Sequence, residues 1–189
     1  MQQHLLMKVG YMVTNRYIDT RGKCETPVTF TEAVVKGLAT GGGLFVPETL
    51  PYLSLEEILS LTKLPYAKRA AYLYRAFGID LPEETIDQLM DAAYGKRFDD
   101  AAICPITSLD ESTHVLELWH GPTSAFKDMA LQCLPYFFSA SAAQLREQGK
   151  LNNTFLILVA TSGDTGKAAL AGFAHVPGTR IIVFYPKNG

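Results

Sequence analysis

The sequence predicts an α/β protein in which a mostly helical N-terminal domain, residues 1–100, precedes the start of a parallel α/β domain, residues 101–189. The first hundred residues carry repeated helix-start signals, namely capping boxes and prolines at first helical turns. Further along, two apolar segments, residues 154–160 and 180–185, flank a helical segment. This order indicates a βαβ unit, and apolar strands of this kind indicate a parallel sheet covered on both faces.

The first elements expected are a short strand at residues 11–17 and a helix that begins after Thr29. Thr29 and Glu32 have the spacing of a capping box, in which each side chain accepts from the backbone N–H of the other residue. Apolar residues at helical spacing follow. The three glycines at 41–43 end the helix, because glycine adopts positive φ at little cost.

Three more helices are expected in the first hundred residues, at about 54–61, 65–78 and 82–95. Ser54 and Glu57 form a second capping box. Pro65 and Pro82 suit first helical turns, where the missing N–H would have no acceptor within the helix. Acidic residues after Pro82 interact favourably with the helix dipole.

The second half alternates between strand and helix patterns. We expect, in order, a strand at 114–119, a helix at 126–147 broken or bent at Pro135, a strand at 154–160, a helix at 166–174 and a strand at 180–185. A complete α/β domain needs more strands than these. We therefore expect the chain to be the front part of a longer protein.

Composition excludes several classes of protein. The net charge is −2 and basic residues never occur more than two in a row, so we expect no nucleic-acid partner. The longest apolar run, residues 155–160, is far shorter than the roughly 20 residues that span a membrane. Three separated cysteines and four separated histidines predict no disulfide framework and no metal site, and they favour a cytoplasmic location.

One segment, HGPTSAFKDMALQ at residues 120–132, places Lys127 just inside a helix that follows a strand. An unprotonated lysine amine forms an imine with an aldehyde, and apolar neighbours such as those around Lys127 disfavour the ammonium. Thr123 and Ser124 can cap the helix or donate to a substrate oxyanion. The alternative is a solvated lysine that follows an ordinary N-cap.

A second segment, TSGDTG at residues 161–166, joins an apolar strand to a helix. Ligands of open α/β sheets bind at this end of the strands, and the free N–H groups of a helix start attract anions. Ser162 and Thr165 add hydroxyl donors. The alternative is a tight turn whose glycines only relieve strain.

The same segment is not a nucleotide-binding P-loop, although Gly166 and Lys167 look like the end of one. The first glycine of that motif would fall at Thr161. The residue after the lysine would be serine or threonine for magnesium, and it is Ala168.

The lysine and glycine segments together resemble those of threonine synthases. Further matching segments lie in the first half of the chain, in the order of that family: TRG at 20–22, FTEAV at 30–34, KGLA at 36–39 and GGLFVPE at 42–48. The resemblance therefore covers nearly the whole chain. It implies a tryptophan-synthase-β-like fold, which is fold type II of the pyridoxal-phosphate enzymes, after a mostly helical N-terminal domain.

The resemblance also implies a reaction and a cofactor. Threonine synthases use pyridoxal 5′-phosphate to convert O-phospho-L-homoserine and water to L-threonine and phosphate, in threonine biosynthesis. Lys127 matches the catalytic lysine that binds the cofactor covalently and then moves protons at Cα and Cβ. The family's loop that faces the substrate carboxylate and the cofactor 3′-oxygen is matched by Ser162, Gly163, Asp164 and Thr165. Asp164 is the cofactor contact in this loop, and Thr123 is a further candidate substrate contact.

In the family, the glycine-rich loop that binds the cofactor phosphate lies well downstream of position 189. We therefore expect these 189 residues alone to bind the cofactor weakly and to be inactive. Two alternatives stay open. One is a threonine-synthase-like phospho-lyase that releases 2-oxobutyrate, and the other is a non-catalytic fragment.

Overall fold

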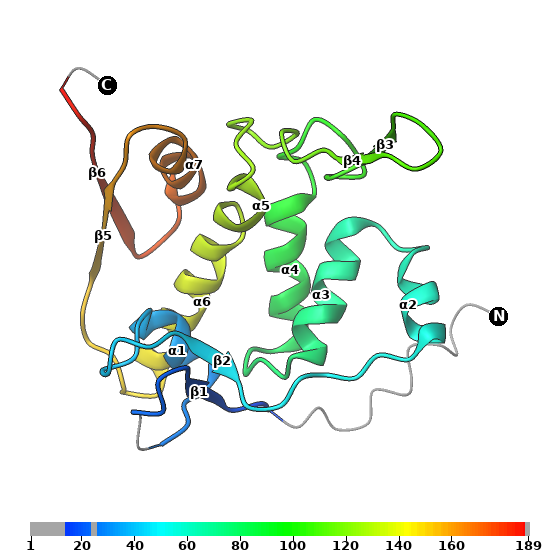
Figure 1. Cartoon of the computed structure of the whole chain (residues 1–189). Helices are drawn as coiled ribbons and strands as arrows, with labels where there is room; N and C mark the ends of the chain where they lie inside the picture. The colour runs from blue at the N-terminus through cyan, green and yellow to red at the C-terminus, as the bar shows by residue number, and fades with distance from the viewer. Residues whose placement is uncertain (1–13, 24–25, 188–189) are drawn as a thin grey trace.

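The computed structural model describes residues 14–23 and 26–187 of the chain. Figure 1 shows helices α3, α4 and α6 side by side, with strands β1 and β2 at one end and the β5–α7–β6 unit beside α6. The elements in chain order are β1 (Tyr17–Asp19), α1 (Phe30–Lys36), β2 (Phe45–Pro47), α2 (Leu55–Leu61), α3 (Tyr66–Ala76), α4 (Glu83–Tyr94), β3 (Ile106–Ser108), β4 (His114–Leu116), α5 (Asp128–Leu131), α6 (Leu134–Glu147), β5 (Phe155–Ala160), α7 (Asp164–Phe173) and β6 (Thr179–Phe184).

The four helices expected in the first half are confirmed, but α1 ends at Lys36, with Gly37 at positive φ as its C-cap, and not at the glycines 41–43. Both capping boxes form: Thr29 accepts from Glu32 N and Ser54 accepts from Glu57 N, and each glutamate accepts in return from the N–H of its cap. The strand expected at 11–17 overlaps β1 only at Tyr17, and residues 11–13 lie outside the described residues. β1 instead pairs antiparallel with β2.

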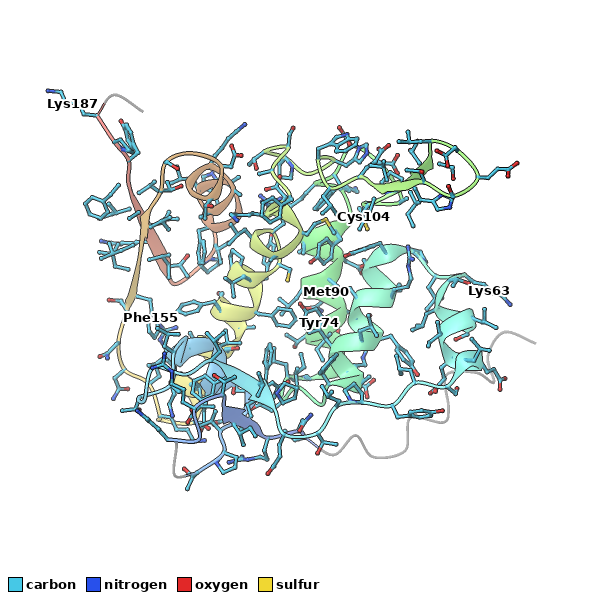
Figure 2. All side chains as sticks on the ribbon, viewed as in Figure 1. Lys63, Tyr74, Met90, Cys104, Phe155 and Lys187 are labelled. Carbon is cyan, nitrogen blue, oxygen red and sulfur yellow. The ribbon has the colours of Figure 1, made fainter. Side chains whose placement is uncertain are left out.

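The main hydrophobic core lies between α3, α4 and α6. Ala71, Ile86, Met90 and Ala93 are at most 1% exposed, and Phe137 of α6 packs against them. Met90 and the half-buried Tyr74 lie at the centre of the molecule in Figure 2. Burying a side chain of this size stabilises the fold by about 1.5–3 kcal/mol, so this core holds the helical layer together.

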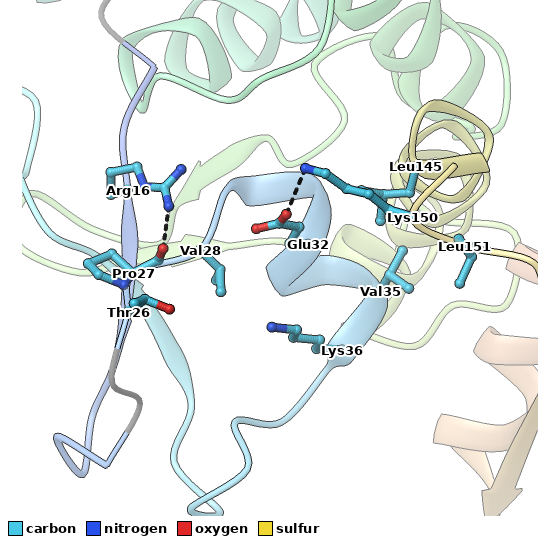
Figure 3. A pocket seen from close by; sticks show the side chains of 10 residues that line it. All are labelled: Arg16, Thr26, Pro27, Val28, Glu32, Val35, Lys36, Leu145, Lys150 and Leu151. Atoms are coloured by element: carbon cyan, nitrogen blue, oxygen red, sulfur yellow. Dashed lines mark hydrogen bonds and ion pairs between the residues drawn. The ribbon is translucent and has the colours of Figure 1, made fainter. Parts of the chain in front are cut away.

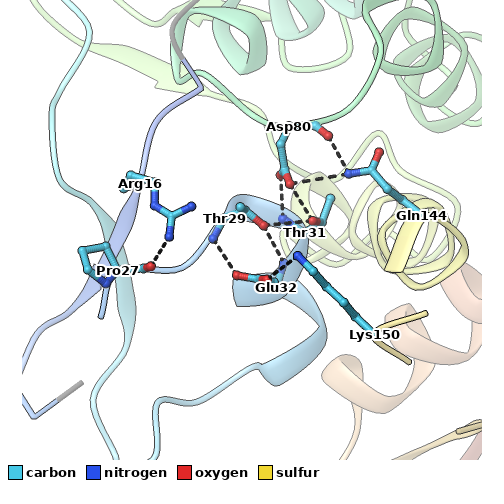
Figure 4. Close-up of polar contacts among 8 residues, drawn as sticks. All are labelled: Arg16, Pro27, Thr29, Thr31, Glu32, Asp80, Gln144 and Lys150. Carbon is cyan, nitrogen blue, oxygen red and sulfur yellow. Dashed lines mark hydrogen bonds and ion pairs between the residues drawn. The ribbon is translucent and has the colours of Figure 1, made fainter. Parts of the chain in front are cut away.

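A polar network fixes the start of α1 on α6 (Figure 4). Asp80 accepts from Thr31 N at 2.9 Å and from Thr31 Oγ1 at 2.7 Å, while its backbone carbonyl accepts from Gln144 Nε2 at 2.7 Å. Lys150, just beyond α6, forms an ion pair with Glu32 at 3.0 Å. The first helix of the chain is thereby joined to the helix that follows the lysine segment.

A pocket of about 500 Å³ lies beside this network (Figure 3). Its basic lining residues are Arg16, Lys36 and Lys150, and its acidic one is Glu32. Arg16 donates from Nη2 to the carbonyl of Pro27. The residues that line this pocket come from neither the lysine segment nor the glycine segment, so it is separate from both.

The segment expected as a helix at 126–147, broken or bent at Pro135, is broken just before that proline. The chain forms α5 and α6 with a break at Gln132 and Cys133, ahead of Pro135. Proline has no N–H and is tolerated in a first helical turn, so Pro135 lies inside the first turn of α6 and does not bend it. The short α5 leaves the backbone around Lys127 in a turn.

The βαβ unit is confirmed, because β5 and β6 pair in parallel around α7. The expectation that both sheet faces are covered is wrong for the described residues. Exposed and half-buried side chains alternate along both strands, since α7 packs on one face alone. The apolar residues Leu156, Leu158, Ile182 and Phe184 on the other face are 45–61% exposed.

The strand expected at 114–119 is shorter than predicted. It is β4, which pairs antiparallel with β3 in a separate hairpin. No helix in the part of the chain that the structure describes is both long and apolar enough to cross a membrane.

Candidate active site

Lys127 lies in the turn between the hairpin β3–β4 and α6, as the residue directly before α5. Its side chain is half-buried, and its Nζ lies 4.1 Å from the centroid of the Phe126 ring, a cation–π contact. Its carbonyl accepts from Leu131 N at 2.8 Å, the first helical bond of α5. The backbone of Lys127 is thus fixed, and its half-buried side chain lies against Phe126. We call residues 120–127 the lysine loop.

Asp128 holds the lysine loop in place. Its side chain is fully buried. The carboxylate accepts from Thr123 N at 2.8 Å, from Thr123 Oγ1 at 2.9 Å and from Gln132 Nε2 at 2.9 Å. Adjacent helix residues point apart, so Asp128 turns inward while Lys127 turns outward. Gln132 Oε1 is buried without a donor among the described residues.

The loop fits closely over this carboxylate. A β-carbon on Gly121 would lie 2.4 Å from Asp128 Cβ, so only glycine fits there. Ser124 has φ of 59°, in the left-handed region that non-glycine residues adopt rarely, and its N–H donates to Gly121 O at 3.0 Å. Such backbone strain persists only where the surrounding structure fixes it.

Two helices also fix α5. Tyr94 of α4 donates from its hydroxyl to the carbonyl of Met129 at 2.6 Å. Burial raises the pKa of Tyr94 above its ordinary range, so the hydroxyl stays protonated and able to donate. On the other side, α7 packs directly on α5, because a β-carbon on Gly172 would lie 1.9 Å from the carbonyl oxygen of Leu131.

An ionic clamp holds the entry to the loop. His120 lies between two carboxylates, with Nε2 2.7 Å from Glu117 and Nδ1 2.6 Å from Asp99. These hydrogen bonds, that to Glu117 first, raise the pKa of His120. A hydrogen bond from Thr107, followed by the one from His120, lowers the pKa of Glu117. The imidazolium form of His120 is therefore favoured.

The glycine turn, residues 161–166, lies at the carboxyl end of β5. Thr161 Oγ1 accepts from Gly163 N at 3.1 Å and from Gly166 N at 3.3 Å. The N–H groups of Asp164 and Thr165 start α7 and have no acceptor within the described residues. A β-carbon on Gly163 would have no atom of the described residues within 4 Å, so the backbone there faces open space.

A pocket of about 300 Å³ adjoins the glycine turn. Ser162 and Gly163 line it together with Lys167 and with residues that follow β6. Ser162 and Asp164 are exposed, and Thr165 is half-buried. The turn therefore presents hydroxyl and backbone N–H donors to solvent beside a small cavity.

Helix α7, which begins in the glycine turn, contacts the lysine loop: Lys167 Nζ donates to Thr123 O at 3.3 Å. Residues that lie 44 positions apart in the sequence are thereby brought together. The structure thus unites the two segments that the sequence singled out.

Relatives in sequence point to one family. A family described as the threonine synthase N terminus matches residues 16–94. Threonine synthase-like 1 of Homo sapiens is 38% identical over 177 residues, which are 88% of this chain and 23% of that protein. The threonine synthase of Pseudomonas aeruginosa is 38% identical over 174 residues, which are 92% of this chain and 35% of that protein.

Solved structures agree. The chain superposes on the threonine synthase of Brucella melitensis, solved with PLP bound, with a TM-score of 0.82 and 35% identity. That match covers 91% of this chain and 36% of the other. The yeast enzyme matches with a TM-score of 0.80 and 31% identity over 92% of this chain. In sequence and in structure, the chain matches the N-terminal part of threonine synthases. It spans about a third of the length of these threonine synthases and about a quarter of threonine synthase-like 1.

The sequence singled out Lys127 and the glycine turn. It did not single out the residues that fix these segments, namely Asp128, Gln132 and Lys167. Asp128 and Gln132 stand at i and i+4, a spacing that indicates a contact on one helix face. The contact between Lys167 and Thr123 has no local signal. Thr123, expected as a substrate contact, is buried with its hydroxyl donated to Asp128.

The residues present fit the aldehyde end of pyridoxal phosphate. Lys127 offers a half-buried amine at the end of a fixed loop, and the glycine turn offers N–H groups without acceptors in the described chain. Within the described ranges, no group of three histidine, cysteine or acidic residues is arranged to hold a metal ion. The N–H groups at the start of α7 suit an anionic ligand.

Proposed function

We propose that this chain acts as the N-terminal part of a threonine synthase, which converts O-phospho-L-homoserine and water to L-threonine and phosphate. The observation that carries the proposal is the contact of Lys167 with Thr123, because it joins a fixed loop bearing Lys127 to an open turn rich in N–H donors. The match to threonine synthases over some nine-tenths of the chain supports the same reading.

We assign Lys127 as the catalytic residue and covalent anchor. Pyridoxal phosphate, when bound, supplies the aldehyde for that bond and a ring that withdraws electrons from the substrate Cα. The Lys127 amine then takes and returns protons at Cα and Cβ of the substrate. A fixed backbone with a free side chain suits this task, since the amine has to reach both carbons in turn.

We assign the glycine turn to binding. The N–H groups of α7 and the hydroxyls of Ser162 and Thr165 donate to the substrate carboxylate, with Gly163 leaving room for the ligand beside the backbone. Asp164 lies beside the cofactor 3′-oxygen in this assignment. Thr123 acts as a substrate contact only if its hydroxyl turns away from Asp128.

We further propose a fold type II arrangement with a helical N-terminal domain at 1–100 and an α/β domain that begins at 101. The open face of β5 and β6 supports this, because further strands and helices of such a domain would cover its apolar side chains. We propose a cytoplasmic location and no nucleic-acid partner, as the composition indicates.

Product analysis with the full-length protein tests the function. We expect L-threonine and phosphate from O-phospho-L-homoserine in the presence of pyridoxal phosphate. Release of 2-oxobutyrate in place of threonine would identify a phospho-lyase, and absence of any product would leave a non-catalytic role. The 189-residue chain alone should bind the cofactor weakly and form no product, which a parallel assay checks.

A further inference from the structure

We infer that Lys167 is a positioning residue that holds the lysine loop against the glycine turn, and that it acts through Thr123. This inference rests on the proposed function. It adds a residue of α7 to a site whose other members lie on the loop and on the turn.

Thr123 is the point at which the loop is held from two sides. Its N–H and its hydroxyl both donate to Asp128, which belongs to the same segment of the chain. Its carbonyl accepts from Lys167, which belongs to α7. Every polar group of this buried residue is therefore engaged. Lys167 is its one described partner outside the lysine segment.

The approach of α7 makes the contact possible. Gly172 brings the α7 backbone against the carbonyl of Leu131, and Lys167 lies five residues earlier on the same helix. Its side chain runs back towards the N-terminus of α7, as helical side chains do, and lines the pocket beside Ser162 and Gly163. One side chain thus both contacts the lysine loop and lines the pocket.

The charge of Lys167 suits this place. A hydrogen bond from an ammonium to a carbonyl is stronger than one between neutral groups, and it leaves two N–H donors of the same ammonium for other acceptors. A movement of the loop relative to the turn would break this bond. We expect its loss to weaken cofactor binding at Lys127 while leaving the fold intact, because Asp128 continues to hold the loop from within.

The test compares Lys167→Met, Lys167→Gln and Lys167→Arg in the full-length protein. Lys63→Met serves as the control, because Lys63 is an exposed lysine between α2 and α3 at the far side of the molecule (Figure 2). Two quantities are measured: the dissociation constant of pyridoxal phosphate, and the pH midpoint at which the absorbance of the Lys127-bound cofactor changes. Circular dichroism checks that each variant folds.

We expect Lys167→Met and Lys167→Gln to weaken cofactor binding roughly tenfold, the loss typical of one charge-assisted hydrogen bond. The pH midpoint should rise in both, since a nearby cation is gone. Lys167→Arg should restore both quantities, and Lys63→Met should change neither. A purely structural role would lower stability without moving the midpoint.

Wild-type values for the Met and Gln variants would overturn the inference while leaving the proposed function intact. A wild-type protein that shows no covalent cofactor would overturn both. If Lys167→Met fails to fold, the Gln and Arg variants decide, because both keep a polar end to the side chain.

Discussion

The lysine loop and the glycine turn use their polar groups in different ways. In the lysine loop, the N–H, hydroxyl and carbonyl of Thr123 all have partners, and the loop is pinned to the fully buried Asp128. In the glycine turn, the N–H groups of Asp164 and Thr165 have no acceptor within the described chain. The polar groups of Thr123 are thus satisfied within the folded chain, whereas the N–H groups of the glycine turn remain available to a ligand.

This difference indicates different roles for the two segments: the lysine loop positions Lys127, and the glycine turn binds the ligand. The contacts of the lysine loop form within the folded chain, so the loop backbone is fixed before any ligand arrives. The glycine turn keeps its donors free, and an anion satisfies them on binding. Substitutions in the loop framework should therefore change stability and positioning, while substitutions in the turn should change ligand binding alone.

The largest effect is expected at Lys127, which lies at the end of the lysine loop. Lys127→Ala in the full-length protein should abolish covalent cofactor attachment and lower turnover about a thousandfold or more, because anchoring and proton transfer both depend on that amine. Its thermal midpoint without cofactor should stay near wild type, since the side chain is only half-buried. Near-normal turnover would contradict the assignment.

The second-largest effect is expected at Asp128, the buried residue that holds the lysine loop. Asp128→Ala should destabilise the protein by about 3 kcal/mol, because it leaves the buried N–H of Thr123 and the amide of Gln132 without an acceptor. Urea denaturation measures this, with the exposed Glu111→Ala as control. A loss no larger than that of the control would mean that Asp128 does not hold the loop.

A smaller effect is expected in the glycine turn. Ser162→Ala should raise KM for the substrate roughly tenfold with little change in kcat, because the hydroxyl serves uniform binding. Stability should be unchanged, since Ser162 is exposed. Steady-state kinetics decide, with the exposed Ser112→Ala as control. A fall in kcat with an unchanged KM would contradict the proposed role of Ser162 in substrate binding.

The smallest effect concerns the clamp at the entry to the loop. Glu117 and Asp99 raise the folded-state pKa of His120 above its ordinary value of 6.5. The stability that this contributes is complete below the unfolded-state pKa and is lost as pH rises through the raised folded-state pKa. Wild type should therefore lose stability relative to His120→Gln as pH rises across that window.

Urea unfolding at several pH values measures this difference. Parallel curves for wild type and His120→Gln would show that the histidine contributes no pH-dependent stability. Thr107→Ala is a useful companion, because Thr107 Oγ1 donates to Glu117 at 2.6 Å without a charge of its own.

Sequence patterns that span only a few residues correctly predicted the helices and strands that depend on those same residues. The capping boxes at Thr29 and Ser54 fixed two helix starts correctly, and the apolar runs of β5 and β6 indicated their parallel pairing. The break before α6 was misplaced, because Pro135 is compatible with a first helical turn and nothing nearby marks Cys133 as the boundary.

Lys127 and the glycine turn were singled out from the sequence, because they lie in short, distinctive segments. The residues that hold these segments in place were not. Lys167 reaches Thr123 across 44 residues, and only the packing of α7 on α5 brings them together. The open face of the sheet was missed for a related reason: an apolar strand pattern says that a face needs cover, but not which residues supply it.

Borohydride trapping tests the central claim most directly. The full-length protein would be incubated with pyridoxal phosphate, reduced with borohydride and digested, and the modified peptide identified by mass spectrometry. We predict a single modified residue, Lys127, and no label there in Lys127→Ala. Labelling of another lysine in place of Lys127, or of none, would contradict the claim that this loop carries the cofactor.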